Sequence, residues 1–496
     1  MDRLIPLHLQ EIIFSSSTPG LSRAISKLYH EGKLIKIAPK IFTPDLTEDP
    51  AKIIRRNAFK IIGHLYPGIQ LSHRSALEFK PTSSENLFLT YTFERKVKLP
   101  GLTLNIMKGK PMIEGDYPFT ASLNVSGQER AILENLQESR KTGPDSKTLP
   151  LPELEEKLEK IVQIRGEDGL NELRDKARQI AGELNMQKEF IRLDKIIGAL
   201  LNTKSTGVLS SPVAIARAFG NPYDSSRVSL FEKLFIQLQQ QVFAYFPDAN
   251  VSPKAFRNFA FYEAYFSNFI EGTKFKLEDA QRIIETGEPM LSRDEDSHDI
   301  LGTYHLVSSR EEMQITPSTP EELIRILKYR HQMMLAARPS KSPGQFKTQN
   351  NHAGDTEFVG HELVRGTLHA GFDFYRALQH PFAKAAYMMF FVSEVHPFAD
   401  GNGRMARIMM NAELVKTGQT KIIIPTVFRE DYIGALRLFT RQKNTDTYIR
   451  MLIRAQLFSD TLAGEDKEHI HDTLVRSNAF REGSEYVLKI VEPLKT

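Results

Sequence analysis

Apolar side chains recur three and four positions apart along most of the chain beyond residue 120, which is the spacing of helices with one buried face. This pattern predicts helices over 129–141, 152–164, 228–246, 252–270, 295–309, 320–335, 381–395 and 403–418. The segment 344–360 interrupts the pattern, because the turn residues Gly354 and Asp355 stand between two short extended pieces. We therefore predict a mainly α chain with one β-hairpin inserted among its helices.

The first 110 residues follow a different pattern. A helical stretch stops at Gly32, and alternating apolar positions over 34–43 predict two strands separated by the turn Ala38-Pro39. A second strand-rich stretch follows at 86–109. A helix followed by a hairpin outlines a winged helix, so we expect four segments. They are a small α+β winged-helix-like domain over 1–110, a helical linker region over 120–225, an all-helical domain with the hairpin over 226–460, and a C-terminal tail over 461–496.

Composition and charge exclude several classes of protein. The chain contains no cysteine, which rules out disulfides, cysteine-ligated zinc and thiol nucleophiles. Residues 1–110 carry 17 Lys and Arg against 9 Asp and Glu, whereas the whole chain has a net charge of +4, so the basic front suggests a module that faces nucleic acid. The chain shows neither a signal-peptide pattern nor the roughly 18 consecutive apolar residues of a membrane span. We expect a cytoplasmic protein without membrane association.

The segment 395–407 gathers residues suited to phosphate chemistry. His396 is a candidate base, and Asp400 is a hard oxygen ligand suited to Mg²⁺. The Gly-Asn-Gly turn at 401–403 precedes a helix and exposes successive backbone N–H groups, which together form an anion nest. Arg404 and Arg407 lie three positions apart and project from the same side of that helix. Each feature alone is ordinary, and their co-occurrence at fixed offsets indicates a site.

These residues match every fixed position of H-x-F-x-(D/E)-G-N-G-R-x-x-R, so residues 260–445 resemble the Fic (filamentation induced by cAMP) family. The resemblance implies an all-helical Fic domain with a β-hairpin flap. It also implies a nucleotidyltransferase that moves AMP from ATP onto a Ser, Thr or Tyr hydroxyl of a target protein. In that reaction His396 would be the general base and Asp400 would hold Mg²⁺. Arg404 would bind the β- and γ-phosphates and Arg407 the γ-phosphate, above a cradle formed by the backbone of Gly401, Asn402 and Gly403 and by the Asn402 side chain.

The predicted hairpin stands where the family has the flap that positions its target. The resemblance assigns Phe346, Lys347 and Thr348 to this flap. The middle of the flap, residues 351–354, is polar and small here, whereas many relatives have a larger apolar residue at that place. The segment 422–436 resembles the Pro…Arg…Tyr segment that follows the motif helix in the family.

A second motif lies upstream, in the segment 267–273. Ser267, Glu271 and Gly272 fit the family's autoinhibitory pattern (S/T)-x-x-x-E-(G/N). The resemblance implies that Glu271 pairs with Arg407 and occupies the space that the γ-phosphate needs, which predicts low basal activity. The alternative is that Gly272 simply ends a helix whose last turn contains Glu271.

The front of the chain resembles the N-terminal region of abortive-infection antitoxins and related winged-helix regulators. The segments 20–44 and 71–79 carry this resemblance, which implies a DNA recognition helix. The implied contacts are to phosphates first and bases second. They come from Ser22, Arg23, Ser26 and Lys27 on the helix, with Lys33, Lys36 and Lys40 near the wing. The alternative is an ordinary solvated basic face on an interaction domain.

Two functions of different classes therefore stand open, and they are compatible. One is an autoinhibited AMP transferase with ATP, Mg²⁺ and a hydroxyl-bearing protein as partners. The other is a DNA-binding, antitoxin-like regulator whose Fic domain senses nucleotide or removes AMP. A third possibility is that the same site transfers UMP, phosphocholine or phosphate; the intact motif favours AMP transfer over phosphate transfer. The family includes dimers, so a homodimer is one of the expected states.

Overall fold

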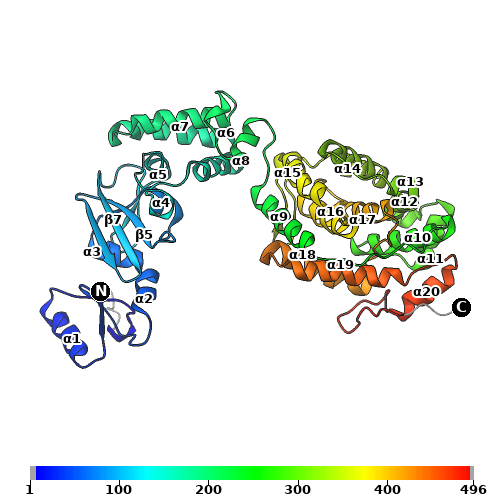
Figure 1. The fold of residues 1–496 in the computed structure, drawn as a ribbon, viewed down its shortest axis with the longest axis horizontal. Helices are drawn as coiled ribbons and strands as arrows, with labels where there is room; N and C mark the ends of the chain where they lie inside the picture. The colour runs from blue at the N-terminus through cyan, green and yellow to red at the C-terminus, as the bar shows by residue number, and fades with distance from the viewer. Residues whose placement is uncertain (1–6, 492–496) are drawn as a thin grey trace. The chain divides into compact units, whose positions relative to one another are not determined.

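The computed structural model describes residues 7–491 and divides into two compact units, Met1–Phe219 and Gly220–Thr496 (Figure 1). Among the described residues, none of the helices combines the length and the apolar character that crossing a membrane requires.

The first unit begins with a small α+β subdomain. Strand β1 (Ile13–Phe14) is followed by helix α1 (Pro19–His30) and by strands β2 (Ile35–Ala38) and β3 (Ile41–Thr43). The strands form an antiparallel sheet in the order β1-β3-β2. Helix α1 starts with Pro19 in its first turn, and Gly32 just beyond its end has φ +69°. The predicted helix and hairpin are thus confirmed, and the core between them consists of Ile13, Ile25 and Leu34.

A mixed six-stranded sheet follows in the same unit, in the order β6-β7-β5-β4-β9-β8. Its strands are β4 (Gln70–Leu71), β5 (Asn86–Tyr91), β6 (Arg95–Leu99), β7 (Leu102–Lys108), β8 (Tyr117–Pro118) and β9 (Asn124–Val125), and the helices beside it are α2 (Pro50–Arg56), α3 (Ala58–Leu65), α4 (His73–Glu78) and α5 (Gln128–Asn135). Ile61 and Ile62 share one core with Leu87 and Leu104. The strands β5, β6 and β7 lie in the stretch 86–109 that was predicted to be strand-rich. The two-residue strands β8 and β9 were not predicted, because they are too short to show a period.

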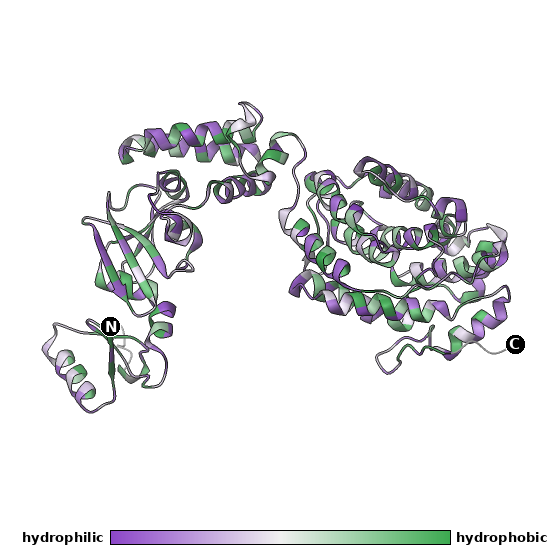
Figure 2. Cartoon of the chain, in the orientation of Figure 1, coloured by the Kyte–Doolittle hydropathy of each residue, from purple (hydrophilic) through white to green (hydrophobic). Residues whose placement is uncertain are grey.

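The rest of the first unit is helical, as predicted. It contains α6 (Leu151–Leu184), α7 (Gln187–Leu200) and α8 (Pro212–Ala218). Helix α6 is kinked at Gly166, whose φ of +69° and ψ of −174° only glycine adopts readily. Both α6 and α7 carry hydrophobic and hydrophilic residues along their length (Figure 2), and their apolar stripes meet in a separate core that includes Leu158, Leu173 and Ile197.

The second unit is almost entirely helical. Its helices are α9 (Ser225–Gln240), α10 (Pro253–Ile270), α11 (Leu277–Thr286), α12 (Asp294–Val307), α13 (Arg310–Met313), α14 (Pro320–Met334), α15 (Val364–Ala377), α16 (Pro381–Val395), α17 (Asn402–Lys416), α18 (Arg429–Gln442), α19 (Thr445–Asp460) and α20 (Lys467–Arg476). Helix α16 lies at the centre, because it is apolar on all sides and residues such as Phe390 and Phe391 are fully buried. It packs along α17, whose Met405 and Met410 are equally buried.

The predicted hairpin is present. Strand β10 (His352–Ala353) pairs antiparallel with β11 (Thr356–Glu357), and Gly354 adopts a positive φ of 57° in the turn between them. The segment 461–496, predicted as a tail, contains α20, and its Ile470 and Leu474 join the main core of the unit.

Candidate active site

The segment that joins α16 to α17 is a tight loop between two buried helices. Helix α16 ends where His396 adopts a left-handed conformation (φ 49°, ψ 57°), and Pro397 then prevents its continuation. Helix α17 begins after Gly401, which also has a positive φ of 74°. A Cβ at Gly401 would lie 2.8 Å from the flexible end of the Met334 side chain, so the positive φ is the main reason that this turn favours glycine.

Phe398 and Asn402 hold this loop in place. Phe398 is fully buried, and its ring stacks on that of His331 at 3.8 Å between centroids. The Asn402 side chain accepts the backbone N–H of Phe398 at 2.9 Å and donates to the Phe398 carbonyl at 2.8 Å. The resemblance implied that this side chain reaches phosphates, whereas here both ends of its amide bind the loop. The Asn402 side chain therefore holds the loop in place, and its Nδ2 keeps one further N–H, so its contact with phosphate stays a prediction.

His331 supports the loop from α14 and was not predicted. Its Nδ1 accepts the N–H of Gly344 at 2.9 Å, so its Nε2 carries the proton and donates to the Asp400 carbonyl at 3.1 Å. Burial lowers the pKa of His331 to about 4, which keeps the ring neutral in this role.

His396 has the geometry of a general base. Its Nδ1 lies 3.2 Å from the Ser393 carbonyl, which can only accept, so Nδ1 donates and the lone pair of the neutral ring is on Nε2. Phe358, which follows the flap strand β11, stacks on the ring at 3.7 Å and 5°. Burial lowers the pKa of His396 to about 4, so the ring is neutral and able to accept a proton at physiological pH.

His396 opens into a pocket of about 390 Å³. The polar groups that line it include Glu271 and the backbone of Gly403, and its apolar lining includes Ile270, Ile433 and Leu436. A pocket with an apolar lining and a few convergent polar groups is typical of a small-molecule site.

Arg407 is buried behind Glu271, which lines this pocket, and four hydrogen bonds hold its guanidinium. Its Nε donates to the Ser267 hydroxyl and its Nη2 to the Ser267 carbonyl, both at 2.9 Å. The Tyr432 hydroxyl lies 3.3 Å from Nη1, and Glu271 Oε1 lies 2.7 Å from Nη2. Burial lowers the pKa of Arg407, but the neighbouring carboxylate of Glu271 outweighs it and the pKa is raised.

The Glu271 carboxylate also covers the first turn of α17. A Cβ placed on Gly403 would lie only 2.2 Å from Glu271 Oε1, so the carboxylate rests directly on the backbone there. This helix N-terminus and the Arg407 guanidinium are the groups expected to bind phosphate. The Glu271 carboxylate therefore lies against both groups to which the family resemblance assigns phosphate binding.

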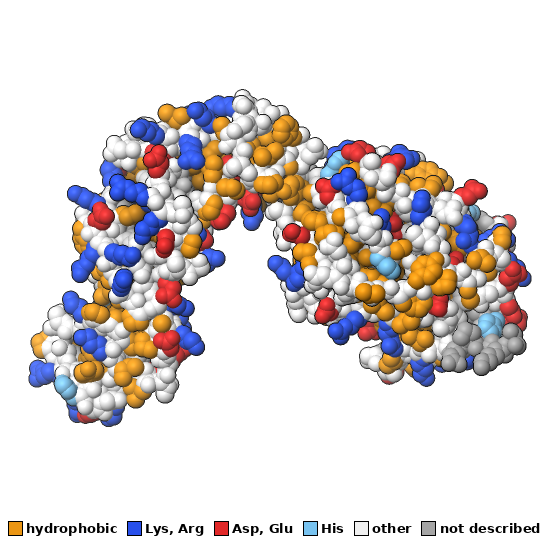
Figure 3. All heavy atoms as spheres, viewed as in Figure 1, with side chains coloured by type: hydrophobic (Ala, Val, Ile, Leu, Met, Phe, Trp, Pro, Cys, Tyr) orange, Lys and Arg blue, Asp and Glu red, His pale blue; other side chains and the backbone are white. Residues whose placement is uncertain are grey.

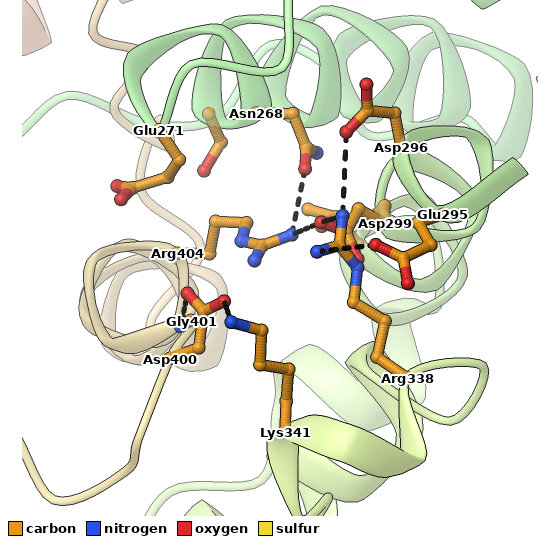
Figure 4. A network of polar contacts seen from close by, with 12 residues as sticks. Asn268, Glu271, Glu295, Asp296, Asp299, Arg338, Lys341, Asp400, Gly401 and Arg404 are labelled. Atoms are coloured by element: carbon orange, nitrogen blue, oxygen red, sulfur yellow. Dashed lines mark hydrogen bonds and ion pairs between the residues drawn. The ribbon is translucent and has the colours of Figure 1, made fainter. Parts of the chain in front are cut away.

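Arg404 and Asp400 belong to a second network (Figure 4). Arg404 Nη1 lies 2.8 Å from Asp299 Oδ2 and donates to Asn268 Oδ1 at 3.2 Å. Asp400 accepts the Gly401 N–H at 2.6 Å, and its other oxygen lies 3.3 Å from Lys341 Nζ. Burial raises the pKa of Asp400, but the Gly401 bond and the charge of Arg404 outweigh it, so the pKa lies below its ordinary value.

The base of the flap is attached to the loop by backbone and side-chain bonds. The Lys347 N–H donates to the Pro397 carbonyl at 2.9 Å, and Asn351 Nδ2 donates to the Phe398 carbonyl at 3.0 Å. Lys347 Nζ bonds Asn351 at 2.6 Å, and burial lowers the pKa of this amine to about 8. Of the other predicted flap residues, Phe346 is half-buried and Thr348 is exposed.

The residues predicted to contact DNA lie in the first unit, on α1 and the following hairpin. All of them are exposed, namely Ser22, Arg23, Ser26, Lys27, Lys33, Lys36 and Lys40. Lys27 and Lys33 lie 3.8 and 2.9 Å from the carboxylate of Glu31, so part of this positive charge is neutralised internally.

Comparison with known proteins agrees with this geometry. The Fic/DOC family model matches residues 321–414. A Fido domain-containing protein of Dictyostelium discoideum is 34% identical over 113 residues, which are 21% of this chain and 79% of that protein. The chain belongs to the Fic/DOC family.

Protein adenylyltransferases are among the relatives that this chain matches at modest sequence identity. Protein adenylyltransferase Fic of Nematostella vectensis is 27% identical over 188 residues, which are 36% of this chain. The chain spans 43% of the length of that relative. A solved fragment of Fic-1 from C. elegans aligns with 65% of this chain and 96% of the fragment, at 17% identity and with a TM-score of 0.37.

Sequence reasoning missed several residues that form the Fic site. These are Asn268, Asp299, His331, Lys341 and Phe358. They come from five separate segments and share no spacing with the motif. The one available signal was a polar residue at a buried helical position, as at Asp299 and His331, which the apolar periodicity alone leaves unexplained.

Proposed function

We propose that this chain is a protein adenylyltransferase, with AMP transfer centred on His396 and held in check by Glu271. One observation carries the proposal: a single pocket joins a neutral histidine with a free Nε2 to the helix start at Gly403 and to Glu271, whose carboxylate pairs with the buried Arg407. Relatives named protein adenylyltransferase Fic support the same reaction.

The chemistry follows from these positions. The target hydroxyl donates its proton to His396 Nε2 as its oxygen attacks the α-phosphorus of ATP. The bond between the α-phosphorus and the bridging oxygen breaks, and pyrophosphate leaves with that electron pair. The apolar lining of Ile270, Ile433 and Leu436 suits the adenine ring, and the flap at 352–357 suits the target chain. Positioning and electrostatic stabilisation supply most of the rate in such a transfer.

The residues present fit a magnesium ion shared with the substrate. Among residues 7–491, no group of three or more His, Asp or Glu could hold a metal by itself. Asp400 offers one half-exposed carboxylate whose pKa is lowered, and Mg²⁺ commonly takes the remaining ligands from phosphates and water. When bound, the ion would neutralise charge on the phosphates. Asp400 would hold it, and the Gly401 N–H and His331 would keep Asp400 oriented.

Autoinhibition is part of the proposal. Glu271 occupies Arg407 and the first turn of α17, so the γ-phosphate cannot take its expected place until the carboxylate leaves. Ser267 holds Arg407 by two bonds and keeps its guanidinium facing this position. The resting chain is therefore expected to have low activity.

The test compares two labelled forms of ATP. Glu271→Gly protein is incubated with Mg²⁺, cell lysate and either α-³²P-ATP or γ-³²P-ATP. Label on protein from the α position alone supports AMP transfer. Label from the γ position alone would show phosphate transfer instead, and no label from either would reject ATP as the donor.

A DNA-binding role is a second candidate, and the exposure of the predicted recognition helix favours it. Helix α1 buries only Ile25 and presents Arg23 and Lys27 to solvent. Figure 3 shows Lys and Arg side chains spread over the visible face of the first unit. We expect salt-sensitive binding to DNA that Arg23→Ala with Lys27→Ala weakens and that His396→Ala leaves intact. Absence of binding to any DNA in a gel-shift selection at low salt would reject this role.

A further inference from the structure

We infer that Asp299 is a positioning residue that sets the Arg404 guanidinium for the β- and γ-phosphates of the nucleotide. This inference rests on the proposed nucleotide site and deepens it. Asp299 lies on α12, far from the motif in sequence, and only the fold brings it to Arg404.

The contact is buried and direct. The side chains of Asp299 and Arg404 are each 3% exposed, and Oδ2 lies 2.8 Å from Arg404 Nη1. Arg338 Nη2 approaches the same oxygen at 2.8 Å, so one carboxylate lies between two guanidinium groups (Figure 4). Without Asp299, two like charges would face each other in a buried place, and Arg404 would lose its fixed orientation.

The network is not arranged for stability alone. Arg404 Nε, Asp299 Oδ1 and Arg338 Nε are buried and have no hydrogen-bond partner among the residues described. Incomplete pairing of buried charges reduces what such a network adds to stability, and it is typical of functional sites. Because Asp299 and Asn268 both contact Nη1, they fix one end of the Arg404 guanidinium and leave its other N–H groups unused by them.

The neighbouring acidic residue supplies a matched control. Asp296 also lies on α12 and pairs with Arg338 at 3.5 Å and with Arg293 at 2.7 Å. Among the described residues, the ion pairs of Asp296 are with Arg293 and Arg338 and not with Arg404. A change at Asp296 therefore disturbs the outer part of the network, whereas a change at Asp299 reaches the arginine that faces the nucleotide.

The experiment measures nucleotide binding by calorimetry in the Glu271→Gly background with Mg²⁺. The probes are α,β-methylene-ATP, which cannot release pyrophosphate, and AMP, which lacks the β- and γ-phosphates. We expect Asp299→Asn to weaken binding of the ATP analogue about three- to tenfold, which is the cost of ordering one long side chain on binding. The affinity for AMP should stay unchanged. Asp296→Asn should leave both affinities unchanged. In an Arg404→Met background, Asp299→Asn should have no further effect.

Each other outcome overturns a defined part of the argument. If Asp299→Asn weakened binding of the analogue and binding of AMP equally, Asp299 would have a general structural role and the inference would be rejected. An unchanged analogue affinity would reject it as well. Failure of the Glu271→Gly parent to bind the analogue would reject the proposed function itself. Should Asp299→Asn fail to fold in thermal unfolding, Asp299→Glu retains the charge at altered reach. Asp299→Glu should then lose less affinity for the analogue than the roughly threefold to tenfold expected for Asp299→Asn, and none for AMP. A loss of affinity for AMP would again reject the inference.

Discussion

Two replacements of Glu271 separate the contribution of its charge to the proposed autoinhibition from the contribution of its side-chain volume. Its carboxylate makes a charge-assisted bond to Arg407 at 2.7 Å and rests on the backbone of Gly403. Such a bond contributes about 1.5–3 kcal/mol, which corresponds to roughly ten- to a hundredfold in a competition with the γ-phosphate. Because 32% of the Glu271 side chain is exposed, solvent screening places the expected value in the lower half of that range.

Two variants with graded effects follow from this magnitude. Glu271→Gly removes both charge and bulk, so the initial rate of AMP transfer from α-³²P-ATP should rise roughly tenfold or more above wild type. Glu271→Gln keeps the bulk over Gly403 but loses the charge, so its rate should lie between the two. His396→Ala in each background provides the blank. A Glu271→Gly rate within twofold of wild type would refute autoinhibition by Glu271. Equal rates for Glu271→Gln and Glu271→Gly would show that the volume of the side chain contributes nothing to it.

Three further predictions concern the loop and its surroundings. Phe398→Ala should lower the free energy of unfolding by about 3–5 kcal/mol in a denaturant titration, because it removes a fully buried ring stacked on His331. Since burial lowers the pKa of both His396 and His331 to about 4, the folded chain binds fewer protons than the unfolded chain between pH 4 and the unperturbed value near 6.5. Melting temperature should therefore fall as pH falls through that window, while kcat stays level from pH 6 to 8, and a kcat that halves between pH 7 and 6 would contradict this pKa. Lys341→Met should tighten Mn²⁺ binding about two- to fivefold at low salt by removing a competing cation from Asp400, and no change in a calorimetric titration would count against that competition.

The sequence was most informative where local chemistry determines the structure. The motif 396–407 and the hairpin turn at Gly354 were predicted correctly, because a left-handed turn, a helix start and a short hairpin each depend on a few neighbouring residues. The apolar period also located α10, α14, α16 and α17 closely. The pattern predicted that the helix over 228–246 ends at residue 246, whereas α9 ends at Gln240. That boundary depends on tertiary packing, which the pattern does not contain.

The supporting residues of the site could not be predicted in the same way. Asp299 and His331 lie on amphipathic helices whose pattern explains their neighbours but not their partners. The contacts of Asn402 with Phe398 were not predicted either, since a side chain in an anion-binding turn can also bind the turn itself, and these contacts appear only in the fold. Which residues meet across 100 positions or more is set by helix packing, and one sequence does not record it.

The measurement that tests the account most directly is the incubation of Glu271→Gly protein with α-³²P-ATP and Mg²⁺, with Glu271→Gly/His396→Ala as its matched control. The account predicts label on the protein itself or on lysate proteins when His396 is present, and none above background in its absence. Equal label in both proteins would contradict the assignment of His396 as the base. No label in either would contradict AMP transfer, and would favour the DNA-binding regulator or a different nucleotide donor.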